Sequence, residues 1–400
     1  MSMSDTKKDL ILIFSASTGG GHNAAAYSLR SGLIKKGYDA KVIDAFGETP
    51  KLGKLVSKGY QELVDKLPKL YHTFYYQWDK QTKYQKRIFG AITYIMNPEI
   101  LPMIYEEKPV LLISTHPFVT SKLGTLKAKG AFNIPILSFV TDYKIHGFYI
   151  SPQVDAYVVG SEYTKKDMIA RGMPPEIIYP FGIPIREGFD QNSVDPKAAK
   201  DPEVRGTILM MAGSLGSSQM EKAFSAVMKV KEPIRVIVVC GKNEAMARDL
   251  RFITKVFDDD TKKVEIHGFV NNVNELMDMS DVIVTKPGGI TTTEAIVKGI
   301  PMLIPYYYPG QEEDNVDFVV ESGIGIKVEK IKDLTSMIEF LIQNQYILWE
   351  MSKNMTETAA DRSEKNTLDL CDTLIARYKE SDAFNTFTEP KNWLYNLMEK

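Results

Sequence analysis

Two segments in the second half of the chain hold residue types that could bind a phosphate group and sugar hydroxyls together. Residues 285–294 have the sequence TKPGGITTTE, which places a Pro-Gly-Gly turn between a strand end and a new helix. Glycines let backbone N–H groups approach an anion closely, and the dipole at a helix N-terminus favours negative charge. Residues 310–315, GQEEDN, add a loop of amide and carboxylate side chains that can hydrogen-bond hydroxyls. This pattern favours a nucleoside diphosphate that carries a sugar.

A third segment could supply a base. Residues 15–22, SASTGGGH, form a Gly-rich turn between a strand and a helix, but they lack the Lys-Ser/Thr pair of a phosphate-binding P-loop. His22 lies at or near the helix start, where the positive end of the dipole disfavours an imidazolium. A neutral imidazole can accept a proton. The alternative is a histidine that only caps or packs on the helix, although three preceding glycines favour close approach of a ligand.

Short runs rich in β-branched residues alternate with helical patterns, which predicts parallel sheets covered by helices on both faces. In the first half these runs are 10–14, 40–44, 110–114, 136–141 and 156–159. In the second half they are 207–211, 234–240, 264–267, 282–285, 302–304 and 325–328. Residues 186–206 show little apolar periodicity, so we expect doubly wound α/β domains at 1–190 and 207–375, with a linker at 191–206. Ligands of such sheets bind beyond the carboxyl ends of the strands, where the three segments lie.

The bulk properties suit a soluble globular chain. Its 400 residues are 44% hydrophobic and 25% charged, which allows two domains with a sizeable core each. The formal net charge of −2 gives no overall argument for nucleic acid. Cys240 and Cys371 are expected to be buried free thiols in a reducing compartment. We expect no secretion signal, and the apolar runs fall short of the ~20 residues of a membrane-spanning helix.

Four motifs in this order resemble one family along nearly the whole chain. They are GGGH at 19–22, GSLG at 213–216, KPGG at 286–289 with Glu294, and QEEDN at 311–315. They are similar to those of the monogalactosyldiacylglycerol synthases and processive diacylglycerol glucosyltransferases of glycosyltransferase family 28. The resemblance implies a GT-B fold, with two Rossmann-like domains facing a central cleft. It also implies an N-terminal acceptor and membrane-binding domain, a C-terminal UDP-sugar domain, and a segment 376–400 that returns to the N-terminal domain.

The resemblance also implies roles for individual residues. His22 becomes the base that acts on the acceptor hydroxyl, in an inverting transfer that needs no metal. Phe269 and Val270 match positions that border uracil, and Glu294 matches a ribose ligand, although its spacing from Thr291 also fits a capping box. The remaining positions assigned to phosphate or sugar are Gly20, Gly21, Gly213, Ser214, Gly216, Gln311, Glu312 and Asn315. The first turn of the expected helix should neutralise the leaving group: Gly288, Gly289, Ile290, Thr291 and Thr292.

Two groups of aspartates could add to the chemistry. Asp142 follows the strand 136–141 and could orient His22 or the acceptor, or serve only the scaffold. The run 258–260, three aspartates, has the spacing of a metal-binding Asp-x-Asp, but it follows a helix and precedes a strand. That is the wrong end of a sheet for a catalytic ligand, so we expect a solvated turn. We therefore expect no metal and no cofactor, with the UDP-sugar acting as donor substrate.

The segment 51–90 concentrates positive charge and aromatic rings. It contains nine basic, three acidic and eight aromatic residues. Such interleaving suits anionic membrane lipids, because each basic residue near the surface contributes ~1 kcal/mol and aromatic rings settle at headgroup depth. Helices that pack their rings inward are the alternative; no nucleic-acid module accompanies the segment. The predicted membrane or acceptor contacts are Tyr75, Tyr76, Trp78, Lys83, Lys86, Arg87 and Phe148, the last at a position where relatives often have tryptophan.

These observations favour an inverting glycosyltransferase that is peripheral to the cytoplasmic face of the cell membrane. It would transfer glucose from UDP-glucose to 1,2-diacylglycerol, and further sugars to the resulting glycolipid. Enzymatic alternatives are a UDP-galactose-dependent monogalactosyldiacylglycerol synthase, transfer to a polyprenyl lipid, and a UDP-sugar epimerase on the same double fold. A membrane regulator that senses UDP-sugars without turnover is the non-enzymatic alternative.

Overall fold

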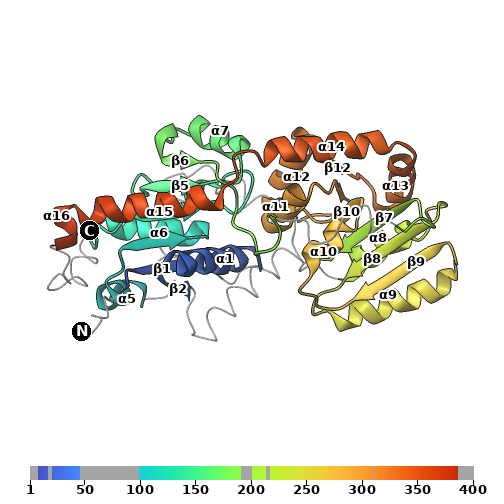
Figure 1. Cartoon of the computed structure of the whole chain (residues 1–400), viewed down its shortest axis with the longest axis horizontal. Coiled ribbons are helices and arrows are strands. Elements are labelled where there is room, and N and C mark those ends of the chain that lie inside the picture. The colour runs from blue at the N-terminus through green and yellow to red at the C-terminus, as the bar shows by residue number, and fades with distance from the viewer. Residues whose placement is uncertain are drawn as a thin grey trace, which may run out of the picture. The chain divides into compact units, whose positions relative to one another are not determined.

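The computed structural model describes residues 8–16, 20–45, 99–190, 201–212, 217–308 and 310–385. The chain divides into two compact units (Figure 1). Unit 1 comprises 1–184 and 361–400, and unit 2 comprises 185–360. These limits differ from the predicted ones of 190 and 375, because residues 185–190 pack into unit 2 and a helix from 364 packs into unit 1.

Unit 1 is built on a six-stranded parallel sheet with the order β2-β1-β3-β4-β5-β6. Its central strands are buried along their whole length, as continuous apolar runs in a doubly covered sheet require. The strands are β1 (Leu10–Ser15), β2 (Asp39–Asp44), β3 (Leu111–Ser114), β4 (Ile136–Phe139), β5 (Ala156–Val158) and β6 (Ile178–Tyr179). The helices are α1 (Gly20–Lys36), α5 (Ile100–Glu107), α6 (Pro117–Ala128), η1 (Gly147–Tyr149), α7 (Glu162–Ala170), η2 (Pro175–Ile177), α15 (Glu364–Lys379) and α16 (Asp382–Asn385).

Unit 2 contains a second six-stranded parallel sheet, with the order β12-β11-β10-β7-β8-β9. The strands are β7 (Gly206–Met211), β8 (Ile234–Val239), β9 (Lys262–His267), β10 (Val282–Thr285), β11 (Met302–Ile304) and β12 (Gly325–Lys327). The helices are α8 (Ser217–Val227), α9 (Glu244–Phe257), α10 (Val273–Asp278), α11 (Gly289–Lys298), α12 (Gln311–Glu321), η3 (Ile331–Asp333), α13 (Leu334–Gln343) and α14 (Gln345–Thr358). Counted from its first strand, this sheet has the order 3-2-1-4-5-6 of dinucleotide-binding Rossmann sheets.

The strand order places one switch point in each sheet, where successive strands leave in opposite directions. In unit 1 it lies between β1 and β3, and in unit 2 between β7 and β10. Ligands of open parallel sheets bind outside the carboxyl ends of the strands at such points. His22 follows β1, and the turn at 286–288 follows β10. The prediction of two doubly wound sheets is therefore confirmed, and two predicted motifs lie at the switch points.

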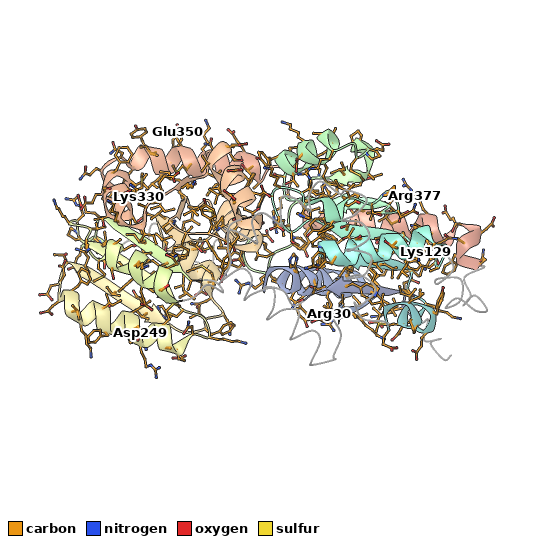
Figure 2. All side chains as sticks on the ribbon, turned by 180° about the vertical axis from the view of Figure 1, so that it is seen from behind. Arg30, Lys129, Asp249, Lys330, Glu350 and Arg377 are labelled. Carbon is orange, nitrogen blue, oxygen red and sulfur yellow. The ribbon has the colours of Figure 1, made fainter. Side chains whose placement is uncertain are left out.

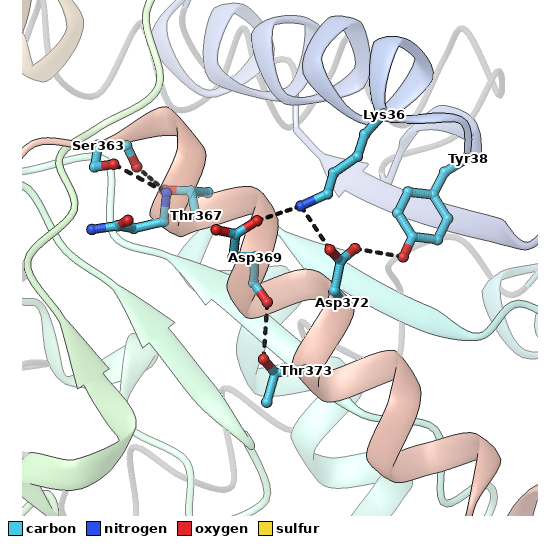
Figure 3. Close-up of polar contacts among 8 residues, drawn as sticks. Lys36, Tyr38, Ser363, Thr367, Asp369, Asp372 and Thr373 are labelled. Carbon is cyan, nitrogen blue, oxygen red and sulfur yellow. Dashed lines mark hydrogen bonds and ion pairs between the residues drawn. The ribbon is translucent and has the colours of Figure 1, made fainter.

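Helix α15 belongs to unit 1 although it follows unit 2 in the sequence. Figure 3 shows Lys36 of α1 between two carboxylates of α15, at 2.7 Å from Asp369 and 2.7 Å from Asp372. The Tyr38 hydroxyl donates to Asp372 at 2.6 Å. On its inner face the helix buries Cys371 in the core of unit 1. The helix thus completes the cover of the first sheet.

Several predictions about the surface and interior can be compared with the structure. Both cysteines are free and buried, as predicted. The aspartates at 258–260 form a turn between α9 and β9, where Asp259 pairs with Lys262 at 3.1 Å, so the prediction of a solvated turn is confirmed. Charged side chains such as Asp249 and Arg377 are exposed on outer helix faces (Figure 2). Within the described residues, no helix is long and apolar enough to cross a membrane.

Candidate functional site

His22 lies in the first turn of α1 and is held by two neighbouring loops of unit 1. Its Nδ1 atom lies 2.8 Å from the backbone carbonyl of Thr115, after β3, and 2.8 Å from the hydroxyl of Thr141, after β4. The Thr115 hydroxyl donates in return to the His22 carbonyl at 3.1 Å. Gly20 and Gly21 are the first two residues of the same helix; Gly20 is exposed and Gly21 is partly buried. Nδ1 of the ring is thereby held by both loops at the switch point.

These contacts define which nitrogen of His22 can act as a base. A carbonyl oxygen only accepts hydrogen bonds, so Nδ1 carries the proton and Nε2 keeps its lone pair. Burial lowers the pKa of His22 to about 4, and the hydrogen bond to Thr115, which favours the charged form, only partly opposes this. The ring is therefore neutral at pH 7. Burial is the main cause of this neutrality, in contrast to the helix dipole used in the sequence argument.

A second histidine lies beside the first. The rings of His22 and His116 meet edge to face, with centroids 4.5 Å apart. His116 caps α6, where its Nδ1 accepts from the backbone of Phe118 at 3.2 Å. Burial, and secondarily the neighbouring His22, hold the pKa of His116 well below its usual value. Two neutral imidazoles with different tautomers therefore lie side by side.

Phe148 and Asp142 follow β4 in the sequence: Asp142 comes directly after Thr141, and Phe148 lies in η1. Phe148 is 9% exposed, and its ring lies 4.5 Å from His146 and 5.4 Å from Phe118. The predicted membrane or acceptor contact is thus an inward-facing ring in unit 1. Asp142 is buried and contributes its charge to the pKa of Tyr149, which burial mainly raises. In the described residues, Nδ1 of His22 donates to the Thr115 carbonyl and lies in hydrogen-bond distance of the Thr141 hydroxyl, and neither threonine was predicted.

The turn after β10 forms the N-terminus of α11 in unit 2. Gly288 is the N-cap in an extended conformation, and Gly289 is the first helical residue. Ile290 and Thr291 are partly exposed in the first turn, whereas Thr292 is buried. Among the described residues the Thr292 hydroxyl has no hydrogen-bond partner. A helix N-terminus that begins after glycines offers backbone N–H groups to an anion.

The structure contradicts the capping-box alternative for Glu294. Because the N-cap is Gly288, Thr291 is already inside the helix and cannot cap it. Glu294 is 2% exposed, and its Oε1 accepts from Arg186 Nη2 at 2.9 Å and from Nε at 3.2 Å. Burial raises the pKa of Glu294, and Arg186 opposes this. Arg186 lies in the segment without apolar periodicity, where no motif marks it, so its pairing with Glu294 was not predicted. A buried carboxylate requires a cation beside it, and this requirement is the signal that points to an arginine.

Residues 311–315 do not form the expected loop. They are the first residues of α12, which Glu313 caps through the backbone N–H of Gly310. Glu312 forms an ion pair with Lys286, and its second oxygen accepts from the backbone of Tyr308 at 2.8 Å. Asn315 is fully buried. Glu312 thus connects the start of α12 to the turn after β10.

The remaining predicted site residues follow β9 or lie outside the described part of the chain. Phe269 follows the edge strand β9 and is 63% exposed, while Val270 beside it is partly buried. The predicted residues outside the described part are Gly213, Ser214, Gly216, Tyr75, Tyr76, Trp78, Lys83, Lys86 and Arg87, and the side chain of Gln311 lies outside it too. Within the ranges that are described, no group of three or more His, Cys, Asp or Glu side chains could hold a metal ion.

Comparison with solved structures shows the fold of the chain. The chain is similar to MurG of Acinetobacter baumannii, with a TM-score of 0.63 and 15% identity over 91% of this chain and 99% of that one. It is also similar to UGT2 of Phytolacca americana, which was solved with UDP-2-fluoro-glucose and pterostilbene. The TM-score is 0.58, with 12% identity over 93% of this chain and 100% of that one. These likenesses and the two Rossmann-like sheets define the GT-B fold.

Sequence comparison identifies the family. The model for monogalactosyldiacylglycerol synthase matches residues 22–185, and the model for the C-terminal domain of glycosyltransferase family 28 matches 207–368. The processive diacylglycerol β-glucosyltransferase of Bacillus mycoides (strain KBAB4) is 30% identical over 87% of this chain and 89% of its own length. The chain belongs to this family of glycosyltransferases. Family membership favours a transferase over the epimerase alternative.

Proposed function

We propose that this glycosyltransferase transfers glucose from UDP-glucose to the hydroxyl of 1,2-diacylglycerol and forms β-glucosyl diacylglycerol. The relative from Bacillus mycoides is named for this activity, and successive additions would give the longer glycolipids that its name implies. The observation that carries the chemistry is the hydrogen bond from His22 Nδ1 to the Thr115 carbonyl, at 2.8 Å. It leaves Nε2 of a neutral ring as the base.

In the proposed reaction, Nε2 of His22 takes the proton of the acceptor hydroxyl. The acceptor oxygen forms a bond to the anomeric carbon while the bond from that carbon to the phosphate oxygen breaks, so UDP leaves with the electron pair. In-line displacement inverts an α-linked donor to a β-linked product. Thr141, whose hydroxyl lies 2.8 Å from Nδ1, stabilises the ring as its charge develops.

The donor would be held by residues of unit 2. The N-terminus of α11, from Gly288 to Thr292, faces developing negative charge with backbone N–H groups and the positive end of its dipole. Glu294 would accept hydrogen bonds from the ribose, and Gln311, Glu312 and Asn315 would contact the sugar. We propose that this electrostatic stabilisation takes the place of a metal ion. Phe269 and Val270 would border the uracil.

The acceptor is a membrane lipid, so we propose peripheral binding at the cytoplasmic face. Support comes from the basic and aromatic composition of residues 51–90, whose positive charge suits anionic lipids. This segment lies outside the described residues. The proposal predicts that the protein sediments with vesicles that contain phosphatidylglycerol, and that it is released by raised salt.

A donor and acceptor panel tests the function. The purified chain is incubated with diacylglycerol micelles and radiolabelled UDP-glucose or UDP-galactose, and lipid-soluble label is measured. We expect glucosyl lipid from wild type, a loss of at least about a hundred-fold for His22→Ala, and unchanged UDP affinity in that variant. Faster transfer of galactose would favour the synthase whose model matches residues 22–185. Saturable UDP-sugar binding without any lipid product would instead support the regulator.

A further inference from the structure

Residues 185–190 dock onto unit 2 and bring a cation to the buried carboxylate of α11. Ile185 and Phe189 are 5% and 3% exposed, and the Phe189 ring lies beside Lys298 at the end of α11, which anchors the segment in unit 2. Asn274 of α10 donates from Nδ2 to the Gly188 carbonyl at 3.2 Å. Gly188 has a φ of 92°, a left-handed conformation that favours glycine. The segment therefore packs as part of unit 2, and this packing fixes the position of Arg186 near its start.

The guanidinium of Arg186 is held on two sides. Its Cζ lies 5.3 Å from the centroid of the Phe189 ring, in a cation–π contact. The Nζ of Lys298 lies 5.9 Å from the centroid of the same ring and forms an ion pair with Asp278 at 2.9 Å, with both side chains at most 1% exposed. Phe189 is thus fixed next to a buried ion pair, and it supports Arg186 in turn.

The contact with Glu294 uses only one carboxylate oxygen. Both Nε and Nη2 of Arg186 donate to Oε1, at 3.2 and 2.9 Å. Within the described residues, Oε2 makes no such contact, so it keeps its lone pairs for another donor. A carboxylate at 2% exposure would tend to take up a proton without a cation beside it, and a protonated carboxyl is a weaker acceptor. Arg186 is 43% exposed and always charged, so it can supply that cation at every working pH.

We propose that Arg186 is a positioning residue for the donor, because by holding Oε1 it directs Oε2 of Glu294 to the hydroxyls of the nucleotide's ribose. The inference rests on the proposed function, in which Glu294 contacts the ribose. It predicts that the site selects a ribonucleoside diphosphate over one that lacks the 2′- and 3′-hydroxyls. The selection depends on a residue that need not touch the ligand.

The test compares UDP with 2′,3′-dideoxy-UDP by calorimetry on the full chain. We expect wild type to prefer UDP by at least about ten-fold, the effect of one hydrogen bond to a charged group. Arg186→Met should reduce the preference to about two-fold or less at pH 7, while affinity for dideoxy-UDP stays unchanged. Because removal of Arg186 raises the pKa of Glu294 further, the preference should return as the pH is raised. Arg186→Lys should retain an intermediate preference.

Arg235→Met is the matched control, because Arg235 and Glu265 form another Arg–Glu pair of unit 2, with Nε and Oε1 2.6 Å apart. It should leave the preference unchanged. Equal loss of affinity for both nucleotides in Arg186→Met would overturn the inference, since that result indicates a contact with the phosphates or a general disturbance of the fold. A preference that survives in Arg186→Met would overturn it as well.

The outcomes separate this inference from the proposed function. If UDP is preferred and Arg186→Met behaves as expected, but no sugar reaches lipid, the positioning role stands and the proposed transfer fails. If wild type transfers glucose to lipid but binds both nucleotides equally, the transfer stands and the positioning role fails. Absence of UDP binding by wild type would overturn both.

Discussion

The pH dependence of transfer tests the assignment of His22 as the base. Burial lowers the pKa of His22 from 6.5 to about 4, which at 1.36 kcal/mol per unit makes charging of the folded ring roughly 3 kcal/mol less favourable. At pH 5.5 an ordinary histidine would be about 90% protonated, whereas His22 would be only about 3% protonated. The base form therefore persists far into the acid range. We expect acceptor turnover to be level from pH 8 to about pH 5.5.

The assay measures kcat/KM for diacylglycerol in mixed micelles between pH 5 and 8. UDP-glucose is kept saturating at every pH, because the raised pKa of Glu294 could otherwise weaken donor binding in acid. His22→Ala serves as the control. Its residual rate should not vary with the protonation state of residue 22, because that side chain can no longer titrate. An acid limb of the wild-type profile with a midpoint near 6.5 would refute the argument, since it would indicate a solvated base.

The same shift in the pKa of His22 makes the stability of the fold depend on pH. The folded pKa of His22 is lower than the unfolded one, so the unfolded chain binds more protons between about pH 4 and 6.5. Stability from this group is complete above pH 6.5 and falls as the pH drops towards 4, by up to roughly 3 kcal/mol. Circular dichroism at each pH therefore has to show a folded protein before a fall in rate is assigned to the base.

Three further predictions concern other parts of the structure. Thr141→Val removes the hydroxyl at 2.8 Å from His22 Nδ1 and should lower kcat by about ten-fold, while Thr141→Ser restores most of it; equal rates for the two variants would argue against the contact. Leu374→Ala, in the core of unit 1, should lower the free energy of unfolding by about 2–5 kcal/mol, whereas the exposed Arg377→Ala on the same helix should change it by less than about 0.5 kcal/mol. Transfer should persist in excess EDTA, and recovery of a lost rate by added Mg²⁺ would contradict the metal-free proposal.

The strands were largely predictable because each is a short apolar run in a doubly covered sheet. The runs 282–285 and 302–304 match β10 and β11 residue for residue. β6 was missed because it has only two residues, Ile178 and Tyr179. Such a strand is defined by its pairing with β5 and not by a pattern of its own.

The partners of the site residues could not be predicted in the same way. Thr115 and Thr141 contact His22 from 93 and 119 residues away in the sequence. Arg186 reaches Glu294 across 108 residues. Local composition says nothing about such long-range pairs, because they depend on which loops the strand order brings together. The motifs therefore predicted candidate residues for the chemistry, but not the residues that contact them.

The return of α15 to unit 1 has a consequence for the order in which the protein folds during synthesis. Unit 2 is continuous, from 185 to 360, so all its strands and helices emerge from the ribosome in one uninterrupted stretch. Unit 1 emerges first, but it lacks the helix that carries Leu374 and Cys371 into its core until residues beyond 361 have been made. Nascent domains usually fold from the N-terminus onwards. Here we expect the later unit to finish first, while the earlier one keeps an uncovered apolar surface that a chaperone could bind.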